Sequence, residues 1–477
     1  MDYGFQPRFS PHVIREVDGI KEEQIFQYAA KQSLGDLRDL LWSSIDNHDS
    51  LDLDQLEYCE RAPNLEIRVL VAIADVDEFV HKTSYADEHA AHNGTSVYTG
   101  VKVFPLFPER LSTDLSSLRE GEDRIAVVVE YFVRQDGSVR FGDVTRAFVQ
   151  NKAKLVYESV GLWLEGKGPA PAPVVKIPGL EEQLKLQHEA SERLHQYRMD
   201  KGALELESIE PKVIVEENKV IALTVGKKMA AHDIIENFMI AANMTMVSFL
   251  DKNHFPVIQR VLKTPDQWPR IVEVACQLKE ELPDVPDAKA LSDFLIKRRR
   301  ADPERFPDLS LTIIKLLGPA EYMMSEASLA RLGHFGLAVS DYVHSTAPNR
   351  RYVDVIIQRL VKAALFKDNT PYTKTELTTI ADVCTERMKE AKKVERFMRK
   401  VAGAILMRGR LGERFEAMVT GASVKGTYAR LLAFPVEGRV IKGEAGLLVG
   451  DRVTVRLVHL DPEQGFIDFE GSGSPHR

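Results

Sequence analysis

Residues 44–76 read SIDNHDSLDLDQLEYCERAPNLEIRVLVAIADV, and this stretch joins an acidic loop to a run of β-forming residues. The run LEIRVLVAIADV at 65–76 is rich in Val and Ile, which predicts a buried strand. We expect this strand to pair with another strand that begins near Leu53. The acidic loop then lies at the mouth of a β-sheet.

The acidic loop carries four aspartates within nine positions, at 46, 49, 52 and 54. Carboxylates placed so close together repel one another and raise one another's pKa unless a cation neutralises them. Aspartates also cap turns through side-chain hydrogen bonds, but such a role for Asp46 or Asp49 accounts for only one or two of the four. A turn-capping loop therefore competes with a cation-binding loop, and the charge density favours the cation.

The spacing and the ligand type restrict which cation the loop can bind. Counting from Asp46 places His48 at the third position and Leu51 at the sixth, where an EF-hand needs an oxygen ligand and a Gly. An EF-hand is therefore excluded. Hard carboxylate oxygens suit Mg2+ or Mn2+, which complete their shells with water and substrate phosphate. Two such ions can activate a water and stabilise a leaving oxygen at phosphorus, so the loop favours phosphoryl chemistry.

A second candidate site lies at 334–359, which reads HFGLAVSDYVHSTAPNRRYVDVIIQR. Pro348 stands where the first turn of a helix can begin, so Arg350 and Arg351 would lie near an electropositive helix N-terminus. Two guanidinium groups at such a corner can bind phosphate oxygens by bidentate hydrogen bonds. A pair of arginines at a helix start is more often a solvated cap. The presence of an acidic loop elsewhere in the chain favours the phosphate role.

Length and cysteine content restrict the class of protein. A chain of 477 residues predicts two or three domains. Its three cysteines are far apart and lack CxxC spacing, which argues against a disulfide scaffold or a zinc site and favours a reducing compartment. No segment approaches the ~18 apolar residues that a spanning helix needs. We expect a cytoplasmic protein with no membrane partner.

The distribution of charge is uneven. The formal net charge of -8 argues weakly against a nucleic-acid partner. Basic residues nevertheless gather late in the chain, at 297–300, 349–352 and 387–400, whereas acidic residues concentrate early. This distribution suits a groove that holds metal ions at one end and phosphates along the rest. Solvated helix faces are the alternative for each single basic run.

Hydrophobic periodicity predicts an α+β chain with a β-barrel at its end. Strands are expected at 125–133 and 142–150, and a Pro/Gly surface linker of polyproline II character at 166–175. Helical patterns cover 12–41 and most of 232–410. From Phe415 about 60 residues of short strands with Gly turns have the size of a five-stranded OB-type barrel.

The two candidate sites carry a family resemblance. The chain resembles the RNB-domain exoribonucleases, the family of bacterial ribonuclease II and ribonuclease R. That family has an acidic loop T-I-D, five residues, D-x-D-D, where this chain has SIDNHDSLDLDQ, and it has a motif HFGL, about eight residues, T-S-P-I-R-R-Y-x-D, similar to HFGLAVSDYVHSTAPNRRYVD. Five further blocks occur in the family's order: VAIADV, GTSVYTGVKVFPLFPERLS, KAKLVY, KGALELESIEPKV and HDIIENFMIAAN.

The resemblance implies roles for the acidic loop. Asp46, Asp52 and Asp54 match the family's metal-site aspartates, and Asp54 holds the position regarded as most important for catalysis. Gln55 stands where the family has its fourth aspartate. An amide oxygen can still bind a hard cation, but without a negative charge, so we expect activity with a raised metal requirement. Asp49 could compensate, although its position is not a family metal position.

The resemblance also implies an RNA path. Arg350 matches the arginine that steadies the scissile phosphate, and Arg351 is its backbone or structural partner. Tyr157 falls on the tyrosine used against the terminal nucleotides, and Phe255 on an aromatic that closes the stack; core packing is the alternative for both. Further RNA-path matches, for which structural roles are equally open, are His334, Tyr342 and Thr346. Glu236 is expected to pair with a basic residue, and candidate barrel contacts are Phe415, Lys425, Tyr428 and Arg430.

The function implied is a 3'-5' exoribonuclease that hydrolyses single-stranded RNA to nucleoside 5'-monophosphates with Mg2+ or Mn2+. An RNA-binding protein on a weakened RNB scaffold is the alternative, because Gln55 removes a charge. A phosphate-dependent phosphorylase is a third and weaker option. We expect a monomer with a helical segment at 1–38, an RNB catalytic domain at 39–410 and an S1 domain at 413–472. Family members usually begin with two cold-shock domains, and 38 residues are too few for one.

Overall fold

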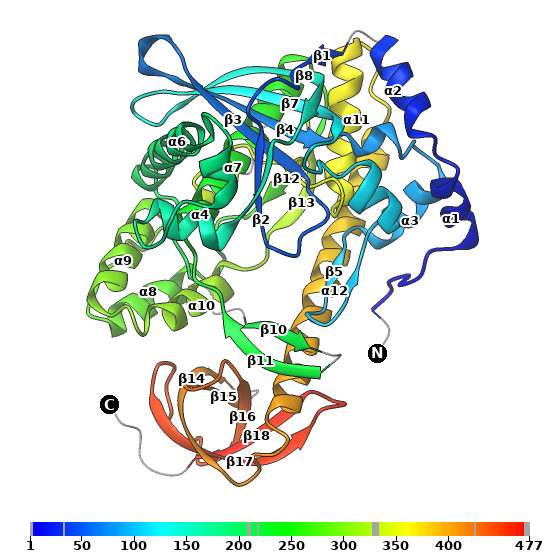
Figure 1. Ribbon diagram of the computed structural model, residues 1–477. Helices are drawn as coiled ribbons and strands as arrows, with labels where there is room; N and C mark the ends of the chain where they lie inside the picture. Colours follow the sequence, from blue (N-terminus) through cyan, green and yellow to red (C-terminus); the bar gives the residue numbers. More distant parts are fainter. Residues whose placement is uncertain are drawn as a thin grey trace.

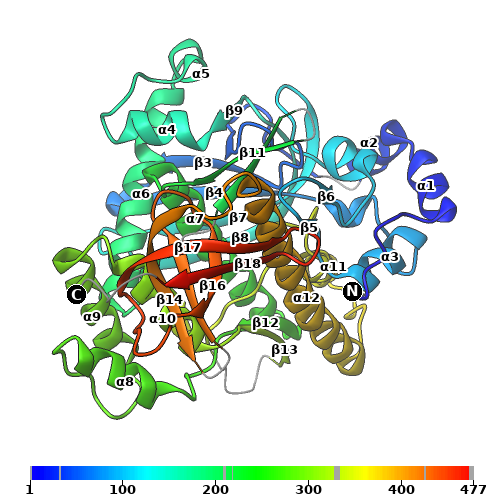
Figure 2. The same cartoon turned by 90° about the horizontal axis from the view of Figure 1, so that it is seen from below.

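The computed structural model describes residues 3–31, 34–207, 211–216, 219–326, 333–423 and 426–471. A large α+β body carries a small closed barrel, which lies at the bottom of Figure 1 and in front of the body in Figure 2. The predicted fold class, a mixed sheet surrounded by helices and followed by a five-stranded barrel, is confirmed. No helix among the described residues is long and apolar enough to cross a lipid bilayer.

The body is built on a seven-stranded sheet in the order β1-β8-β7-β4-β3-β2-β9. The β1–β8 and β2–β9 pairs are parallel, and the other neighbours are antiparallel. The predicted pairing is confirmed, because Gln55 at the start of β3 lies opposite Ile73 of β4. The strands of the sheet are β1 (Gly35–Asp36), β2 (Ser43–Asp46), β3 (Gln55–Arg61), β4 (Ile67–Ala74), β7 (Asp123–Val133), β8 (Val139–Gln150) and β9 (Ala153–Val156).

Helices cover the sheet and shield its apolar side chains from water. Helix α6 contacts β3, and the Gln183 side chain of α6 accepts a hydrogen bond of 2.9 Å from the backbone N–H of Cys59. Helix α7 packs against α6, β7 and β8. Val71, Val129 and Phe238 are among the fully buried residues of this main core. The helices of the N-terminal half are α1 (Pro11–Asp18), α2 (Glu22–Lys31), α3 (Tyr85–Asn93), α4 (Tyr157–Leu164), α5 (Ala172–Lys176), α6 (Leu180–Asp200) and α7 (Ala230–Lys252).

The second half of the body is mainly helical, as expected. Trp268 and Phe306 anchor a separate core formed by α8, α9 and α10. The long helix α12 begins at a capping box, in which Thr373 and Glu376 satisfy backbone N–H groups of the first turn. The helices of this half are α8 (Trp268–Gln277), α9 (Ala288–Ala301), α10 (Phe306–Leu317), α11 (Tyr352–Phe366) and α12 (Lys374–Leu406).

The C-terminal barrel closes in the order β14-β15-β16-β18-β17. Its core includes Val455 and Phe469, together with Ala404 and Met407 from the end of α12 and the residue that follows it. The same helix contributes Leu377 and Cys384 to the main core of the body. The barrel strands are β14 (Arg414–Ser423), β15 (Gly426–Leu431), β16 (Glu437–Lys442), β17 (Arg452–Asp461) and β18 (Phe466–Gly471).

Short elements complete the chain. Three two-stranded sheets are formed by β5 (Val97–Tyr98) with β6 (Val103–Phe104), β10 (Pro211–Glu216) with β11 (Lys219–Val225), and β12 (Val257–Val261) with β13 (Glu321–Ser325). Short helical turns lie at Pro63–Leu65, Val76–Glu78, Arg110–Leu115 and Phe335–Leu337.

Two local expectations are wrong. The segment 12–41 is not one helical stretch, because α1 ends at Asp18 and α2 at Lys31, and the short strand β1 lies further along. Gly19 and Gly35 are weak helix formers, and Gly35 pairs with Ala147 as part of the sheet. The expected linker at 166–175 contains the start of α5, in which Pro173 lies in the first turn, where a missing N–H costs nothing.

Candidate functional site

The acidic loop is fixed at both arms by the sheet. Asp46 is the last residue of β2, and Asp54 directly precedes β3. The backbone carbonyl of Asp54 accepts a hydrogen bond of 2.9 Å from the N–H of Ala74, which extends the β3–β4 ladder by one step. Lys154 of β9 holds the middle of the loop, since its ammonium donates to the backbone carbonyls of His48 and Ser50 at 3.2 and 2.5 Å. The backbone that carries the loop aspartates is therefore held in place by hydrogen bonds.

The second candidate segment meets the first at Asp54. The backbone N–H of Asn349 donates to Oδ1 of Asp54 at 2.9 Å, and Nε of Arg350 lies 3.2 Å from Oδ2. The Asp54 side chain is 2% exposed. Asn349 is itself held in place, because its side-chain oxygen accepts a hydrogen bond of 2.6 Å from the Ser116 hydroxyl. The turn before α11 thus presents a guanidinium and a backbone N–H to a buried carboxylate.

The three predicted metal-site aspartates share one electrostatic environment. Burial raises the pKa of Asp46 to about 6, against the lowering effect of a Ser44 hydrogen bond and the charge of Arg350. Burial raises the pKa of Asp54 to about 7, with Arg350 again lowering it and Asp52 raising it. The pKa of Asp52 is raised by burial as well, and Arg350 opposes that effect. Arg350 is therefore the common positive neighbour of all three carboxyls.

The aromatic residue Tyr157 lies next to the strand pair that carries Asp46. Tyr157 is the first residue of α4 and directly follows β9, which pairs with β2 in register so that Val156 lies opposite Asp46. Its ring stacks on that of His232, with centroids 4.2 Å apart and planes 8° from parallel. The negative charge of Asp46 raises the pKa of Tyr157 in addition to the larger effect of burial. Phe255 packs against the main core as a partly buried side chain.

Comparison with known proteins assigns the chain. The family model described as the RNB domain matches residues 35–367, and that of the RNase II-type exonuclease C-terminal S1 domain matches 413–471. The chain belongs to the RNB family. The predicted recognition is confirmed, and with it the enzyme class, a hydrolytic 3'-5' exoribonuclease of a metal-dependent nuclease family.

The relatives of this RNB chain are named ribonuclease R. That of Aquifex aeolicus is 29% identical over 98% of this chain and 69% of its own length. That of Thermotoga maritima is 30% identical over 97% of this chain and 68% of its own length. The chain therefore spans about two thirds of the length of both relatives. The structure of Mycoplasma genitalium RNase R in complex with ribose-methylated single-stranded RNA has a TM-score of 0.87 and 24% identity, and covers 99% of this chain and 76% of that one.

The metal-ligand roles of the residues at the RNB site stay predictions. Oδ2 of Asp46 is buried and has no hydrogen-bond partner in the described part of the chain. A carboxylate oxygen left in this state is the kind of donor that a divalent cation satisfies. Gln55 is buried at the first position of β3. Across residues that the structure describes, no three His, Cys, Asp or Glu side chains are gathered closely enough to hold a metal ion as they stand.

Arg351 pairs with an acidic residue of α11, the helix that it precedes, and its predicted role stays a prediction. Its guanidinium forms two hydrogen bonds with Asp354, at 2.9 and 2.8 Å. Asp354 also accepts the backbone N–H of Ala347 at 2.8 Å, which fixes the turn that carries Arg350. The predicted pairing of Glu236 is confirmed, because it lies 2.7 Å from the Lys228 ammonium.

Two of the other predicted RNA contacts, His334 and Tyr342, belong to an aromatic cluster. The rings of His334 and Tyr342 lie edge to face at 5.8 Å, and Tyr342 contacts His344 in the same way at 5.6 Å. Burial lowers the pKa of His334 to about 4, so its imidazole is neutral at pH 7. Thr346 is buried. These residues border the Arg351 turn, and their RNA roles stay predictions.

Two predicted barrel contacts are engaged elsewhere. Phe415 is buried in the barrel core, and Arg430 lies 3.0 Å from the carboxylate of Asp308 on α10. Lys425 lies outside the described residues. Tyr428 lines a cavity of about 530 Å³ between the barrel, α10 and α12. Within the barrel, Tyr428 and Arg430 are therefore the described predicted contacts that line this cavity.

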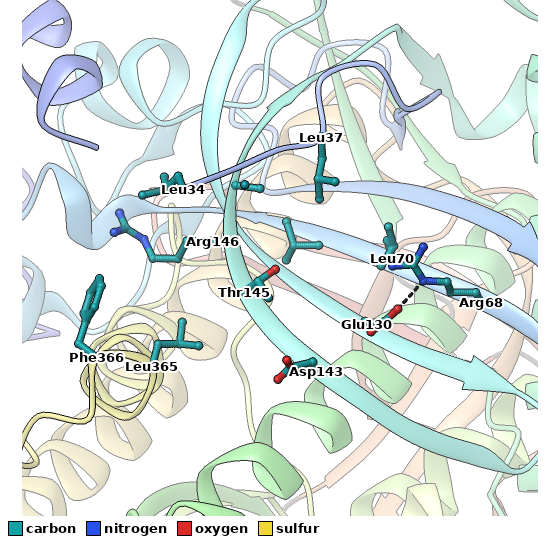
Figure 3. A pocket seen from close by; sticks show the side chains of 13 residues that line it. Leu34, Leu37, Arg68, Leu70, Glu130, Asp143, Thr145, Arg146, Leu365 and Phe366 are labelled. Carbon is teal, nitrogen blue, oxygen red and sulfur yellow. Dashed lines mark hydrogen bonds and ion pairs between the residues drawn. The ribbon is translucent and has the colours of Figure 1, made fainter. Parts of the chain in front are cut away.

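Sequence reasoning missed three neighbours of the site. The Asn349 N–H donates to Asp54, and the ring of His232 stacks on that of Tyr157. Tyr98 lowers the pKa of Asp52 through a hydrogen bond. All three lie inside the matched blocks, but a pairing between distant blocks leaves no local pattern. A separate cavity of about 460 Å³, lined by Leu37, Phe366 and others, contains none of the predicted site residues (Figure 3).

Proposed function

We propose that this protein hydrolyses single-stranded RNA from its 3' end and releases nucleoside 5'-monophosphates. The observation that carries the proposal is the contact between Asp54 and the Arg350 turn. It joins the two motifs that the family's chemistry requires, although 296 residues separate them. The same arrangement supports assigning Asp54 and Arg350 as the catalytic pair.

The chemistry divides between the acidic loop and the arginine. Asp46, Asp52 and Asp54, with the amide of Gln55, would hold Mg2+ or Mn2+. The bound cation would supply water activation and charge neutralisation at phosphorus. Arg350 offers a fixed positive charge to the phosphate oxygens, on which negative charge builds up in the transition state. Because Asp54 and the Asn349 N–H hold the guanidinium turn in place, little reorganisation is needed when substrate binds.

The RNA path combines stacking with positive charge. Tyr157 and His232 form an aromatic platform beside the acidic loop. Stacking on such a platform accepts any base, because every base has a π face. The cavity of 530 Å³ between the barrel and the body is lined by Lys315, Arg396 and Lys400 as well as Tyr428. We assign this basic cleft to the phosphate backbone of the incoming strand.

An RNA-binding protein without nuclease activity is the second candidate, and Gln55 is the observation that favours it. Loss of one carboxylate weakens the attraction for a divalent cation. The two candidates differ in whether the remaining acids suffice for turnover.

The deciding experiment follows a 5'-labelled single-stranded RNA incubated with the full chain and either Mg2+ or Mn2+. The proposal expects progressive 3' shortening with release of nucleoside 5'-monophosphates. Binding without shortening in both metals supports the RNA-binding candidate. Release of nucleoside diphosphates that depends on added phosphate would instead indicate a phosphorylase.

We further propose the domain limits 1–38, 39–410 and 413–472, and a monomer that acts in the cytoplasm. The three cysteines are free, with Cys59 and Cys384 buried, which supports a reducing compartment. Size-exclusion chromatography with light scattering tests the monomer.

A further inference from the structure

A buried glutamate lies two residues beyond Gln55 on the same strand. Glu57 is 0% exposed, and neither oxygen of its carboxyl group has a hydrogen-bond partner in the described part of the chain. Side chains two apart on a strand lie on the same face of a sheet, so Glu57 and Gln55 share a face. Position 55 lacks the family's fourth metal-site aspartate. The buried carboxyl group of Glu57 lies two residues further along the strand, on the same face.

An isolated buried carboxyl group is costly unless something compensates it. Removing a carboxylate from water without a partner costs several kcal/mol as an order of magnitude. Ser43 lies directly opposite Glu57 in the β2–β3 pair, and its hydroxyl is also buried without a partner. The position therefore contains polar groups whose hydrogen-bonding capacity is not used by the described residues around it.

The acidic loop lies within electrostatic reach of Glu57. After burial, the charge of Asp46 is the second factor that raises the pKa of Glu57. The charges of both carboxyls also raise the pKa of Tyr157, after the larger effect of burial. Oδ2 of Asp46 is likewise buried without a partner. One carboxyl oxygen of Asp46, at the end of β2, and both of Glu57, on the neighbouring strand β3, are thus buried without a hydrogen-bond partner among the described residues.

We propose that Glu57 supplies the cation site at Asp46 with the negative charge that Gln55 lacks. Mg2+ usually keeps several waters, so Glu57 can act on the cation directly or through one of those waters. The number of carboxylates at the site then stays at four, with one displaced along β3. This inference rests on the proposed metal site, and it makes Glu57 a positioning residue for the cation.

The test measures Mn2+ binding to the metal-free full chain by isothermal titration calorimetry. Glu57→Gln is expected to lower the affinity for Mn2+ about 10–100-fold, the usual effect of removing a supporting group from a metal site. Glu57→Met, which removes the charge but keeps a similar volume, should show the same loss. Glu60→Gln is the matched control, because Glu60 projects from the opposite face of β3 and is paired with Arg68. Its affinity should equal that of the wild type.

A double variant that moves the carboxylate from position 57 to position 55 tests whether the negative charge itself matters. Gln55→Asp introduced together with Glu57→Gln restores four carboxylates and should return the affinity to within about threefold of the wild type, since charge count sets the attraction. Thermal unfolding in EDTA gives an independent readout. Without metal, Glu57→Gln should be at least as stable as the wild type, because an unpartnered acid is removed, whereas its stabilisation by Mn2+ should shrink.

The outcomes separate this inference from the proposed function. Wild-type Mn2+ affinity in a folded Glu57→Gln or Glu57→Met variant overturns the role of Glu57 and leaves the metal site intact. Failure of the double variant to regain affinity also overturns it. If the wild type itself binds no Mn2+, the proposed metal site fails instead.

Discussion

Nε of Arg350 lies 3.2 Å from Oδ2 of Asp54, and the backbone N–H next to it, on Asn349, holds the other oxygen of the same carboxylate. The acid is buried, whereas 47% of the arginine side chain is exposed. One end of the pair is therefore fixed in the protein, and the other can face a substrate phosphate.

Asp54→Asn should lower cleavage at least about a hundredfold, the usual cost of losing one electrostatic group at a reaction centre. RNA affinity should change little, because the side chain is buried and the amide keeps its shape. Single-turnover cleavage and filter binding measure the two effects. Asp266→Asn is the control, since Asp266 is an exposed aspartate outside the acidic loop. Cleavage by Asp54→Asn at the wild-type rate would refute the catalytic assignment.

Arg350→Lys should lower kcat about 10²–10³-fold with an unchanged melting temperature, because lysine keeps the charge but not the forked geometry. Arg351→Met should act differently. It leaves the fully buried Asp354 without its ion-pair partner, which costs about 3–5 kcal/mol. Unfolding in urea and steady-state kinetics distinguish the variants. A large stability loss in Arg350→Lys would contradict the assigned division of roles.

Metal binding should strengthen as pH rises from 5 to 8. The pKa values of Asp46 and Asp54, raised to about 6 and about 7, mean that both carboxyls lose protons within this range, and a cation binds the deprotonated forms. Calorimetry with Mn2+ at several pH values measures the effect. An affinity that is flat across this interval would show that neither carboxyl binds the ion.

The raised pKa values of these carboxyls should make the metal-free protein less stable as pH rises. A carboxyl whose pKa is raised on folding binds more protons in the folded state, so its contribution to stability falls as pH rises through the interval from 3.8 to about 7. Urea unfolding in EDTA should therefore show a smaller decline with pH for Asp54→Asn than for the wild type. Equal slopes would contradict the buried state of this acid.

Tyr157→Ala should weaken RNA binding by about 1–3 kcal/mol, the value of one base stacked on an aromatic side chain. Tyr157→Phe should bind nearly as the wild type does, since the ring that stacks on His232 is retained. Fluorescence anisotropy with a short single-stranded RNA measures both. If the alanine variant binds normally but melts early, Tyr157 is a core residue.

The sequence predicted what depends on local patterning. The Val- and Ile-rich run at 65–76 contains β4, because a strand that is buried along almost its whole length needs a near-continuous series of apolar residues. The helical expectation for 12–41 failed where Gly35 joins the sheet through a partner more than a hundred residues away. The aspartate and arginine motifs were recognised by resemblance, whereas the Asn349 N–H depends on a backbone position that no residue type encodes.

Phe415 and Arg430 show how far residue type alone can predict the RNA contacts of the barrel. An aromatic and a cation in a small barrel have the composition of a nucleic-acid surface, but one fills the interior and the other pairs with Asp308 of the neighbouring body. Residue type alone cannot distinguish these outcomes, because both depend on which face of a strand meets another part of the chain.

Helix α12 places Leu377 in one core and Ala404 in another, and 33 residues of continuous helix connect them. At 1.5 Å per residue this rod is about 50 Å long. A swivel between body and barrel would have to break the helix or pull its end out of an apolar interior. The two parts are thus rigidly coupled, and loosening of the barrel by heat or denaturant should be transmitted along α12 to its N-terminal end, which packs in the main core of the body.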